Sequence, residues 1–284
     1  MSNLINFNGN LVPKDQPVFT ASSRAARYGD ALFETMRMLN GKILFEEMHA
    51  DRLFNGFLLL HFILPEHFNW QFLKKEIEKL ISKVPQGTHR RIRLTVSRGD
   101  GGISEEPAKS PQFMIESWLI EEYSYNTEGF VVDVFDPIRK STDSYSNLKS
   151  ANYLPSVMSA IFAKENRLDE CLLLNSNQRI CDATISNVFW TKDQTVFTPP
   201  LKEGGIAGVM RNYLLRKLPD AGYLVAEKNV DTNTLLQADE IFFTNVIRGI
   251  SWVKTFRNTE FTNQFSSAFF KKFISPLMLV EQPS

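Results

Sequence analysis

Hydrophobic residues recur along this chain with two different periods, and segments of each kind alternate. Apolar and polar positions that alternate strictly predict half-buried strands, whereas apolar positions three and four residues apart predict amphipathic helices. Strands are predicted at residues 31–39, 42–45, 91–97, 111–120, 130–135, 171–174, 188–191, 241–245 and 249–256. Helices are predicted at residues 46–62, 69–84, 154–167 and 264–274, with another that starts within 204–211 and continues through Leu215. This pattern indicates a mixed α/β protein.

Turn signals and apolar stripes add detail to these elements. Asn8-Gly9 and Asn40-Gly41 each separate two apolar runs, and both residue types tolerate the positive φ of a hairpin turn. The first long helix is expected to bury Phe54, Phe57, Leu58 and Phe62. The helix after residue 153 is expected to bury Leu154, Val157, Met158, Ala160, Ile161 and Ala163. The last helix is expected to pack its aromatic side chains as core, namely Phe265, Phe269, Phe270 and Phe273.

A polar stretch near the middle of the chain is the best candidate for a linker. We expect a smaller N-terminal α/β domain at residues 1–121, a linker at 122–128 and a larger C-terminal domain at 129–284. A chain of 284 residues is long enough for two domains that each bury a core.

Composition and charge narrow the possible functions. The chain is 43% hydrophobic, as expected for a globular protein, and its 32 basic and 32 acidic residues leave a formal net charge of zero. The sequence has no long run of like-charged residues, so it does not indicate a surface that binds nucleic acid or a membrane. Cys171 and Cys181 fit neither a zinc site nor a disulfide framework, so we expect buried free thiols and no metal. The N-terminus lacks the features of a signal peptide, and we expect a cytoplasmic protein.

A single lysine stands among small and polar residues in the stretch Ser146–Tyr153, where a strand-like region gives way to a helix-like one. Loss of hydration at such a junction lowers the pKa of a lysine and makes a nucleophilic amine available near neutral pH. The alternative, a solvated surface lysine, is the more common case for a lysine taken alone. Lys149 is therefore a candidate catalytic residue, and this assignment needs support from other motifs in the chain.

Other polar residues are candidates for binding an anion. Arg37 shares a strand face with Phe33, so it either extends outward from an edge strand or binds an anion. His49 and Arg52 are neighbours on one helix face, and their spacing alone favours an exposed polar face. The glycine-rich segment 204–211 opens a helix, whose first N–H groups and dipole suit a phosphate.

Several loose motifs then follow one another in a specific order. They are Tyr28-Gly29-Asp30 with Phe33-Glu34-Thr35, His49 with Arg52-Leu53, Arg98-Gly99, Lys149 with Asn152, Asn187-Val188-Phe189, and Thr198-Pro199 with Gly208 and Arg211. This set, which spans nearly the whole chain, resembles the class IV aminotransferases. That pyridoxal-phosphate family includes branched-chain and D-amino-acid aminotransferases and aminodeoxychorismate lyase.

The resemblance implies a fold and a set of roles. It implies the two-domain fold of D-amino-acid aminotransferase, with pyridoxal 5'-phosphate between the domains, and a homodimer whose partner loop closes the site. Lys149 matches the lysine that forms the Schiff base and moves the proton, and Arg52 matches the arginine that pairs with the phosphate. The backbone N–H groups of Val209 and Met210 match the phosphate cradle at the helix start. Further cofactor contacts are implied for Tyr153, Ser186, Asn187, Asn245 and Val246.

Two departures from the family pattern bear on mechanism. Asp182 stands where relatives carry a glutamate that bonds the pyridine nitrogen, so it keeps the charge but is one methylene shorter. Gly101-Gly102-Ile103-Ser104 lacks the further arginine of the lyase relatives, which modestly favours transamination. By position only, the candidates for contacting the substrate are Tyr28, Phe33, Arg37 and Arg93.

The leading hypothesis is therefore a branched-chain-like aminotransferase that acts on a small amino acid and a 2-oxo acid through Lys149. Aminodeoxychorismate lyase, which would use the same lysine to eliminate pyruvate and leave an aromatic amine, is the alternative enzyme. A cofactor-binding homologue with little catalysis is a third possibility, against which the intact Lys149 argues.

Overall fold

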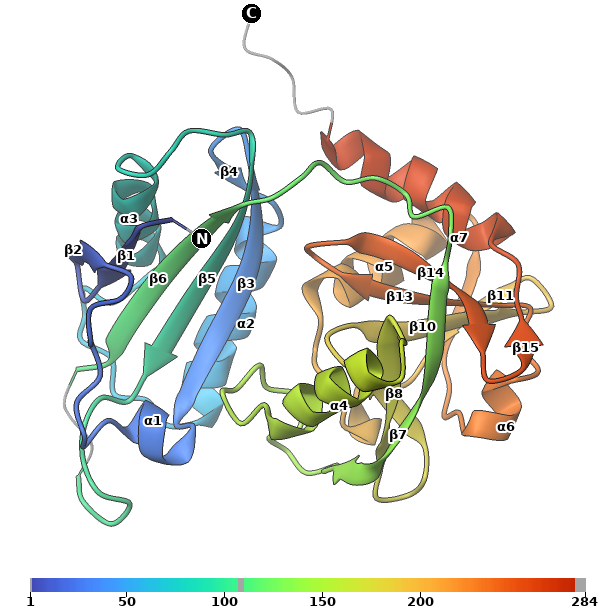
Figure 1. Ribbon diagram of the computed structural model, residues 1–284, viewed down its shortest axis with the longest axis horizontal. Coiled ribbons are helices and arrows are strands. Elements are labelled where there is room, and N and C mark those ends of the chain that lie inside the picture. The colour runs from blue at the N-terminus through green and yellow to red at the C-terminus, as the bar shows by residue number, and fades with distance from the viewer. Residues whose placement is uncertain (1, 107–109, 279–284) are drawn as a thin grey trace, which may run out of the picture. The chain divides into compact units, whose positions relative to one another are not determined.

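The protein, seen here in a computed structural model that describes residues 2–106 and 110–278, folds into two compact units (Figure 1). Unit 1 comprises Met1–Glu122 with Lys149–Asn152, and unit 2 comprises Tyr123–Leu148 with Tyr153–Ser284. The sequence-based division had assigned residues 149–152 to the second domain. They belong to unit 1 because their backbone bonds to a strand of that unit, as described below for the candidate site.

Unit 1 is a six-stranded sheet with two long helices. Its elements are β1 (Leu4–Phe7), β2 (Asn10–Pro13), α1 (Arg24–Tyr28), β3 (Ala31–Leu39), β4 (Lys42–Ile43), α2 (Glu46–Leu59), α3 (Trp70–Ile81), β5 (His89–Ser97) and β6 (Gln112–Leu119). The strand order is β2-β1-β6-β5-β3-β4, and every pair is antiparallel. Both predicted Asn-Gly turns are confirmed, with positive φ at all four residues.

The two faces of this sheet differ in chemistry. Ile92, Leu94 and Val96 point to one face and are fully buried, together with Leu53 of α2 and Ile77 of α3. Figure 1 draws both helices behind the sheet, where they cover this apolar face. Because side chains alternate along a strand, the opposite face of β3, β5 and β6 carries arginine, threonine and aromatic residues. Unit 1 thus combines an apolar core on one side with a polar face on the other.

The buried face of helix α2 differs from the predicted one. It ends at Leu59, and Leu58 is 74% exposed, so the expectation that Leu58 is buried was wrong. The buried residues are His49, Leu53, Gly56 and Phe57. The helix therefore turns a histidine toward the sheet, which is possible only because the sheet supplies a polar partner there.

Unit 2 is built on a mixed nine-stranded sheet. Its elements are β7 (Phe130–Lys140), α4 (Leu154–Glu165), β8 (Glu170–Asn175), β9 (Ile180–Ala183), β10 (Asn187–Lys192), β11 (Thr195–Thr198), a 3-10 turn (Leu201–Glu203), α5 (Val209–Asp220), β12 (Leu224–Glu227), α6 (Thr232–Leu235), β13 (Glu240–Asn245), β14 (Gly249–Phe256), β15 (Thr259–Glu260), α7 (Gln264–Phe269), a π-helical turn (Phe270–Ile274) and a 3-10 turn (Ser275–Met278). The expected mixed α/β class is confirmed. Five short elements, β9, β11, β12, α6 and β15, have no counterpart in the sequence-based prediction.

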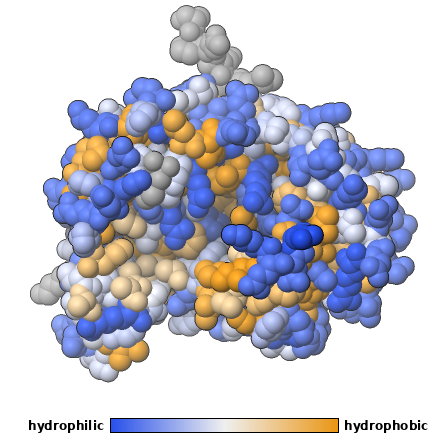
Figure 2. Space-filling model, in the orientation of Figure 1, coloured by the Kyte–Doolittle hydropathy of each residue, from blue (hydrophilic) through white to orange (hydrophobic). Residues whose placement is uncertain are grey.

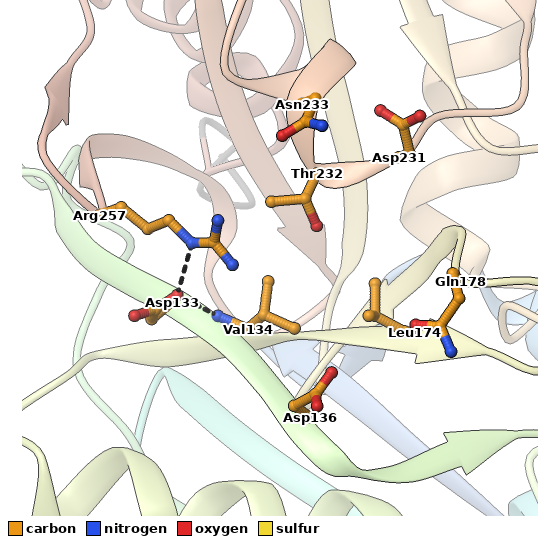
Figure 3. A pocket seen from close by; sticks show the side chains of 9 residues that line it. All are labelled: Asp133, Val134, Asp136, Leu174, Gln178, Asp231, Thr232, Asn233 and Arg257. Carbon is orange, nitrogen blue, oxygen red and sulfur yellow. Dashed lines mark hydrogen bonds and ion pairs between the residues drawn. The ribbon is translucent and has the colours of Figure 1, made fainter.

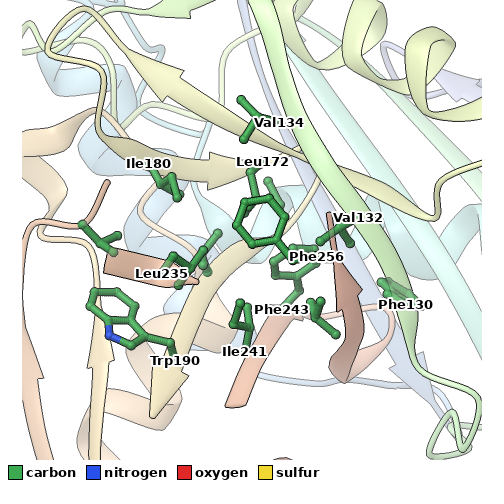
Figure 4. Close-up of a cluster of buried hydrophobic side chains, with 14 of the residues drawn as sticks. Phe130, Val132, Val134, Leu172, Ile180, Trp190, Leu235, Ile241, Phe243 and Phe256 are labelled. Carbon is green, nitrogen blue, oxygen red and sulfur yellow. The ribbon is translucent and has the colours of Figure 1, made fainter. Parts of the chain in front are cut away.

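The strand order is β12-β11-β10-β13-β14-β7-β8-β9, with β15 paired to β14. Figure 4 shows the core of this unit, where inward-facing side chains from strands far apart in sequence meet around Phe243 and Phe256. Most of the aromatic core expected of the last helix is present, because Phe269, Phe270 and Phe273 are buried, whereas Phe265 is only partly buried. The two cysteines, Cys171 and Cys181, are buried and free, as predicted.

The predicted buried face of α4 was wrong. Leu154 is 63% exposed, and Val157, Met158 and Ile161 are also exposed; of the residues predicted to be buried, Ala163 is buried, and it lies with Ser159 on the buried face. Small residues let the helix approach the sheet closely, and Ser159 Oγ lies 3.2 Å from Thr184 Oγ1. The apolar stripe of α4 consequently remains on the surface of unit 2. No helix in the described part of the chain is long and apolar enough to span a membrane.

The orientation of α2 can be tested at two neighbouring residues, of which one is buried and the other exposed. Phe57 is 1% exposed and touches the rings of Phe54, Phe62 and Phe68, so Phe57→Ala should lower the free energy of unfolding by about 3–5 kcal/mol. Leu58→Ala, the matched control, should change it by less than about 0.5 kcal/mol because the side chain is already in water. Urea denaturation measures both, and equal losses would contradict the orientation of α2.

Candidate functional site

Lys149 is held against β3 by backbone hydrogen bonds within unit 1. The N–H of Phe33 donates to the carbonyl of Lys149 at 2.9 Å, and the N–H of Ala151 donates to the carbonyl of Ala31 at 2.8 Å. An antiparallel bridge joins Leu32 to the intervening serine at position 150. The Lys149 ammonium lies 4.6 Å from the centroid of the Phe33 ring, a cation–π distance. The predicted catalytic lysine is therefore half-buried and fixed at its backbone, not a freely solvated surface residue.

Arg52 and His49 do not form the exposed polar face that their spacing suggested. Both bind the carboxylate of Glu34, which projects from β3 and is 1% exposed. Arg52 Nε donates to Glu34 Oε1 at 2.8 Å, Arg52 Nη2 donates to Oε2 at 2.5 Å, and His49 Nδ1 lies 2.6 Å from Oε2. This forked pairing fixes the plane of the Arg52 guanidinium.

The charges in this cluster follow from burial and contact. Burial by itself would raise the pKa of Glu34, but Arg52 and His49 outweigh it and lower the pKa to about 2. Burial lowers the pKa of His49, helped by the positive charges of Arg52 and Lys149 and opposed by Glu34. A neutral His49 donates from Nδ1 to Glu34, and its buried Nε2 has no hydrogen-bond partner in the described part of the chain. The cluster thus keeps an ionised carboxylate and a fixed arginine beside a neutral imidazole.

The start of α5 in unit 2 has the geometry of an anion site. Gly208 occupies the N-cap position and contributes no side chain, so the first N–H groups of the helix, those of Val209 and Met210, are left uncovered by their own cap. A Cβ on Gly208 would lie 1.8 Å from Asn187 Oδ1, so only glycine allows this close approach. Arg211 points away and donates to the carbonyl of Pro199 at 3.0 Å. The helix start therefore offers backbone donors and a positive dipole to a phosphate.

Asn187 and Asp182 lie next to this helix start. Asn187 Nδ2 donates to Asp182 Oδ1 at 3.0 Å and to the carbonyl of Ile206 at 2.8 Å. Asp182 is 4% exposed and also binds Lys140, whose Nζ lies 2.9 Å from Oδ2. Sequence reasoning did not single out Lys140, since it follows Arg139 in a polar stretch and its partner lies far along the chain.

Ser186 and Asn245 belong to a second polar network in unit 2. Asn245 Nδ2 donates to Ser186 Oγ at 2.9 Å, and Ser186 Oγ donates to Glu170 Oε1 at 2.9 Å. Glu170 is 2% exposed, and burial raises its pKa while Arg248, at 2.8 Å, lowers it. Val246 follows directly after β13 and is buried. Glu170, which sequence reasoning missed, therefore orients two of the predicted cofactor residues.

Tyr153 stands at the N-cap of α4, in unit 2, and burial together with Asp182 raises the pKa of its phenol. Four further residues were predicted from position to contact the substrate, and they lie in unit 1. Phe33 has the guanidinium of Arg93 over its ring at 3.9 Å, and Arg93 Nε also lies 3.8 Å from Glu116 Oε2. Tyr28 ends α1 and is 37% exposed.

The interpretation of Arg37 as an outward-pointing edge residue was wrong. Strand β3 lies between β5 and β4, and Arg37 is 2% exposed. Its Nη2 donates to the backbone carbonyl of Glu121 and to Nδ1 of His89, the latter at 3.0 Å. Burial and the neighbouring Arg37 charge both lower the pKa of His89. These bonds tie the end of β6 to β3 and β5.

A hollow elsewhere in unit 2 contains none of the predicted site residues. Figure 3 shows its lining, in which the guanidinium of Arg257 bonds to Asp133 at 3.3 Å beside Asp136 of β7 and Asp231 at the start of α6. The described residues hold no group of His, Cys, Asp and Glu arranged for a metal ion. The candidate functional residues therefore form two sets, one around Lys149 in unit 1 and one around Asp182 in unit 2.

Substitution of two acidic residues in unit 1 tests whether a buried ion pair contributes more to the free energy of unfolding than an exposed one. Glu34→Gln should lower the free energy of unfolding by about 3 kcal/mol, because it leaves the Arg52 guanidinium, whose side chain is only 13% exposed, without its counterion. Glu46→Gln, whose partner is the half-exposed Lys74, should cost less than about 1 kcal/mol. The folded-state pKa of Glu34 is depressed, so its stabilisation is present above its ordinary value of 4.5 and is lost as the pH falls toward about 2. Urea denaturation from neutral pH downward measures both effects, and equal losses in the two variants would contradict this account.

Comparison with known proteins assigns the family. The "Amino-transferase class IV" family matches residues 31–256. An aminodeoxychorismate lyase of Vibrio harveyi is 25% identical over 232 residues, which cover 80% of this chain and 83% of the relative. A putative branched-chain-amino-acid aminotransferase of Methanocaldococcus jannaschii is 26% identical over 255 residues, which cover 84% and 83%.

Among solved structures, the T.th. branched-chain amino acid aminotransferase complexed with N-(5'-phosphopyridoxyl)-L-glutamate has a TM-score of 0.86 at 20% identity. The match covers 98% of this chain and 95% of that one. The shared fold extends over both units, and the family match includes Lys149, Asp182 and the start of α5. The chain therefore belongs to the class IV aminotransferase family.

Proposed function

We propose that this protein is a pyridoxal-phosphate-dependent aminotransferase that exchanges an amino group between a small, branched-chain-like amino acid and a 2-oxo acid. The observation that carries the proposal is the fixed position of Lys149, whose backbone is bonded to β3 and whose amine lies against the Phe33 ring. Class IV aminotransferases use this cofactor, and the structural relative described above holds a phosphopyridoxyl derivative.

The residues present fit the cofactor in charge and shape. The start of α5 offers backbone donors that suit a phosphate, and glycine is required at its N-cap by the close approach of Asn187. Arg52 supplies a planar cation, and Asp182 a buried carboxylate. When bound, pyridoxal phosphate withdraws the electron pair that develops at the substrate's α-carbon.

Each residue then has a defined task. Lys149 would hold the cofactor covalently through its amine and would move the proton at the substrate's α-carbon, while Arg52 and the N–H groups of Val209 and Met210 would bind the phosphate. Asp182 would accept a hydrogen bond from the ring nitrogen. Further contacts are proposed for Tyr153, Ser186, Asn187, Asn245 and the backbone of Val246.

The substrate carboxylate needs a cation on the polar face of unit 1. Arg93 is the best candidate, because its guanidinium lies over the Phe33 ring, the same ring that the Lys149 amine contacts. Arg37 is a weaker candidate, since its guanidinium is bonded to His89 and to the Glu121 carbonyl. Tyr28 is exposed at the end of α1 and is proposed to contact the substrate.

A lyase is the second candidate function, supported by the relatives named aminodeoxychorismate lyase. It would use Lys149 in the same way but release pyruvate and an aromatic amine without a keto-acid acceptor. The segment Gly101-Gly102-Ile103-Ser104 lacks an arginine and favours transamination. A homologue that binds the cofactor with little catalysis is the third candidate.

A homodimer is proposed for the assembly. The apolar stripe of α4 supports it, because Leu154, Val157, Met158 and Ile161 lie on the surface of a single chain. Figure 2 shows an orange area over this helix. Exposed apolar patches of this kind commonly mark protein interfaces.

We also propose a cytoplasmic location. Cys171 and Cys181 remain free thiols, which suits a reducing compartment. Burial raises the pKa of both to about 12, so neither is a reactive thiolate near neutral pH.

An absorption spectrum of the protein with added pyridoxal phosphate tests the activity. The wild type should develop a visible band that Lys149→Ala lacks, because only the lysine amine forms the covalent link. Lys164→Ala, on α4, is the control and should keep the band. An L- or D-amino acid that converts the band to the pyridoxamine form identifies the donor.

The outcomes separate the three candidates. A band that no amino acid converts, together with release of pyruvate from aminodeoxychorismate, would favour the lyase. A band with neither reaction would favour a binding homologue. A wild type without any band would contradict the proposed function altogether.

A further inference from the structure

Asp182 is not a solitary carboxylate, because a lysine shares its buried site. Lys140 Nζ lies 2.9 Å from Asp182 Oδ2, which also accepts the backbone N–H of Ile206 at 2.9 Å. Asp182 Oδ1 accepts Asn187 Nδ2 at 3.0 Å. The side chains of Lys140 and Asp182 are only 15% and 5% exposed, so water screens this pair weakly.

The sheet of unit 2 fixes the pair from its backbone. Lys140 is the last residue of β7 and stands opposite Asn175 of β8, while Asp182 of β9 stands opposite Leu173 of the same strand. Residues opposite one another in a sheet point to the same face, as do Leu173 and Asn175, two apart on one strand. Lys140 and Asp182 are therefore neighbours across β8, and β8 sets the distance between them.

Lys140 keeps its proton in this site. Burial would lower its pKa, but the contact with Asp182 outweighs burial and raises the pKa. The other titratable groups that act on the pair are Cys181 and Tyr153, whose thiol and phenol are neutral, and Glu170. The pair of Lys140 and Asp182 thus carries no net charge.

One acceptor position of Asp182 remains for a ligand. A carboxylate offers about four lone-pair sites, and the three bonds described above occupy three of them, two on Oδ2 and one on Oδ1. The remaining site, on Oδ1, suits a ring N–H. The Lys140 ammonium bonds only to Oδ2, so it reduces the negative potential at Asp182 without filling that site.

We propose that Lys140 is a positioning residue that acts through Asp182 on the pyridine nitrogen of the cofactor: it orients the carboxylate and, by neutralising it, lowers the proton affinity of the ring nitrogen. The inference rests on the proposed function, because it requires pyridoxal phosphate to bind with its ring at Asp182. A ring nitrogen beside a neutral pair holds its proton less tightly than one beside a lone carboxylate, and it is a weaker electron sink. Lys140 therefore sets the strength of the sink.

The proton on the ring nitrogen is directly measurable. Nitrogen-15 NMR of the holoprotein, loaded with pyridoxal phosphate labelled at the ring nitrogen, reports protonation as a shift and needs no turnover. Lys140→Met removes the ammonium but keeps most of the side-chain length, and should move the resonance toward the pyridinium value and raise the pKa of the ring nitrogen. Lys140→Gln, which is also uncharged, should do the same and serves if the methionine variant does not fold. Lys140→Arg should keep the wild-type position.

A matched lysine–aspartate pair in unit 2 provides the control. Lys192 Nζ lies 3.0 Å from Asp239 Oδ1, and both side chains are nearly half exposed. Lys192→Met should leave the ring resonance unchanged. A purely structural role for Lys140 would lower the melting temperature without moving the resonance, and an unmoved resonance in folded Lys140→Met or Lys140→Gln holoprotein would overturn the proposal. A wild type that forms no visible band with pyridoxal phosphate would instead overturn the proposed function on which it rests.

Discussion

A buried carboxylate must be neutralised or hydrogen-bonded, and this constraint organises the candidate functional residues within each unit. Three such carboxylates are nearly inaccessible to water, and each one holds residues proposed to bind the cofactor. The sets are Glu34 with Arg52 and His49, Asp182 with Lys140 and Asn187, and Glu170 with Ser186 and Arg248. Arg52, Asn187 and Ser186 thus keep fixed orientations because each one bonds to a buried carboxylate, as a preorganised site requires.

Local patterns predicted much of the fold. The hairpin turns at Asn8-Gly9 and Asn40-Gly41, the strand Gly249–Phe256 and a helix start within residues 204–211 were all visible in the sequence, because each depends on residues a few positions apart. The candidate site was found in a different way, through the order and spacing of loose motifs. The junction within Ser146–Tyr153 first marked Lys149 as a candidate, and the order of the motifs supported it, whereas Asp182 emerged from that order alone.

Interactions between distant segments account for the misses. The spacing of His49 and Arg52 suggested an exposed face, but the residue that buries them, Glu34, lies on a strand 15 and 18 positions earlier. Lys140 was overlooked because its partner lies 42 residues further on. The helical spacing of apolar residues in α4 was recognised correctly, but the apolar face was wrongly assigned to the core. An exposed apolar patch uses the same residue types as a core, so the sequence alone does not distinguish the two.

The central claim is that Lys149 is the amine that binds the cofactor covalently. Incubation of the protein with pyridoxal phosphate, reduction with borohydride and peptide mass spectrometry test this claim most directly. The account predicts a pyridoxyl group on Lys149 and none on Lys140, whose ammonium is held by Asp182. Modification of Lys140 in place of Lys149, or of neither lysine, would contradict it.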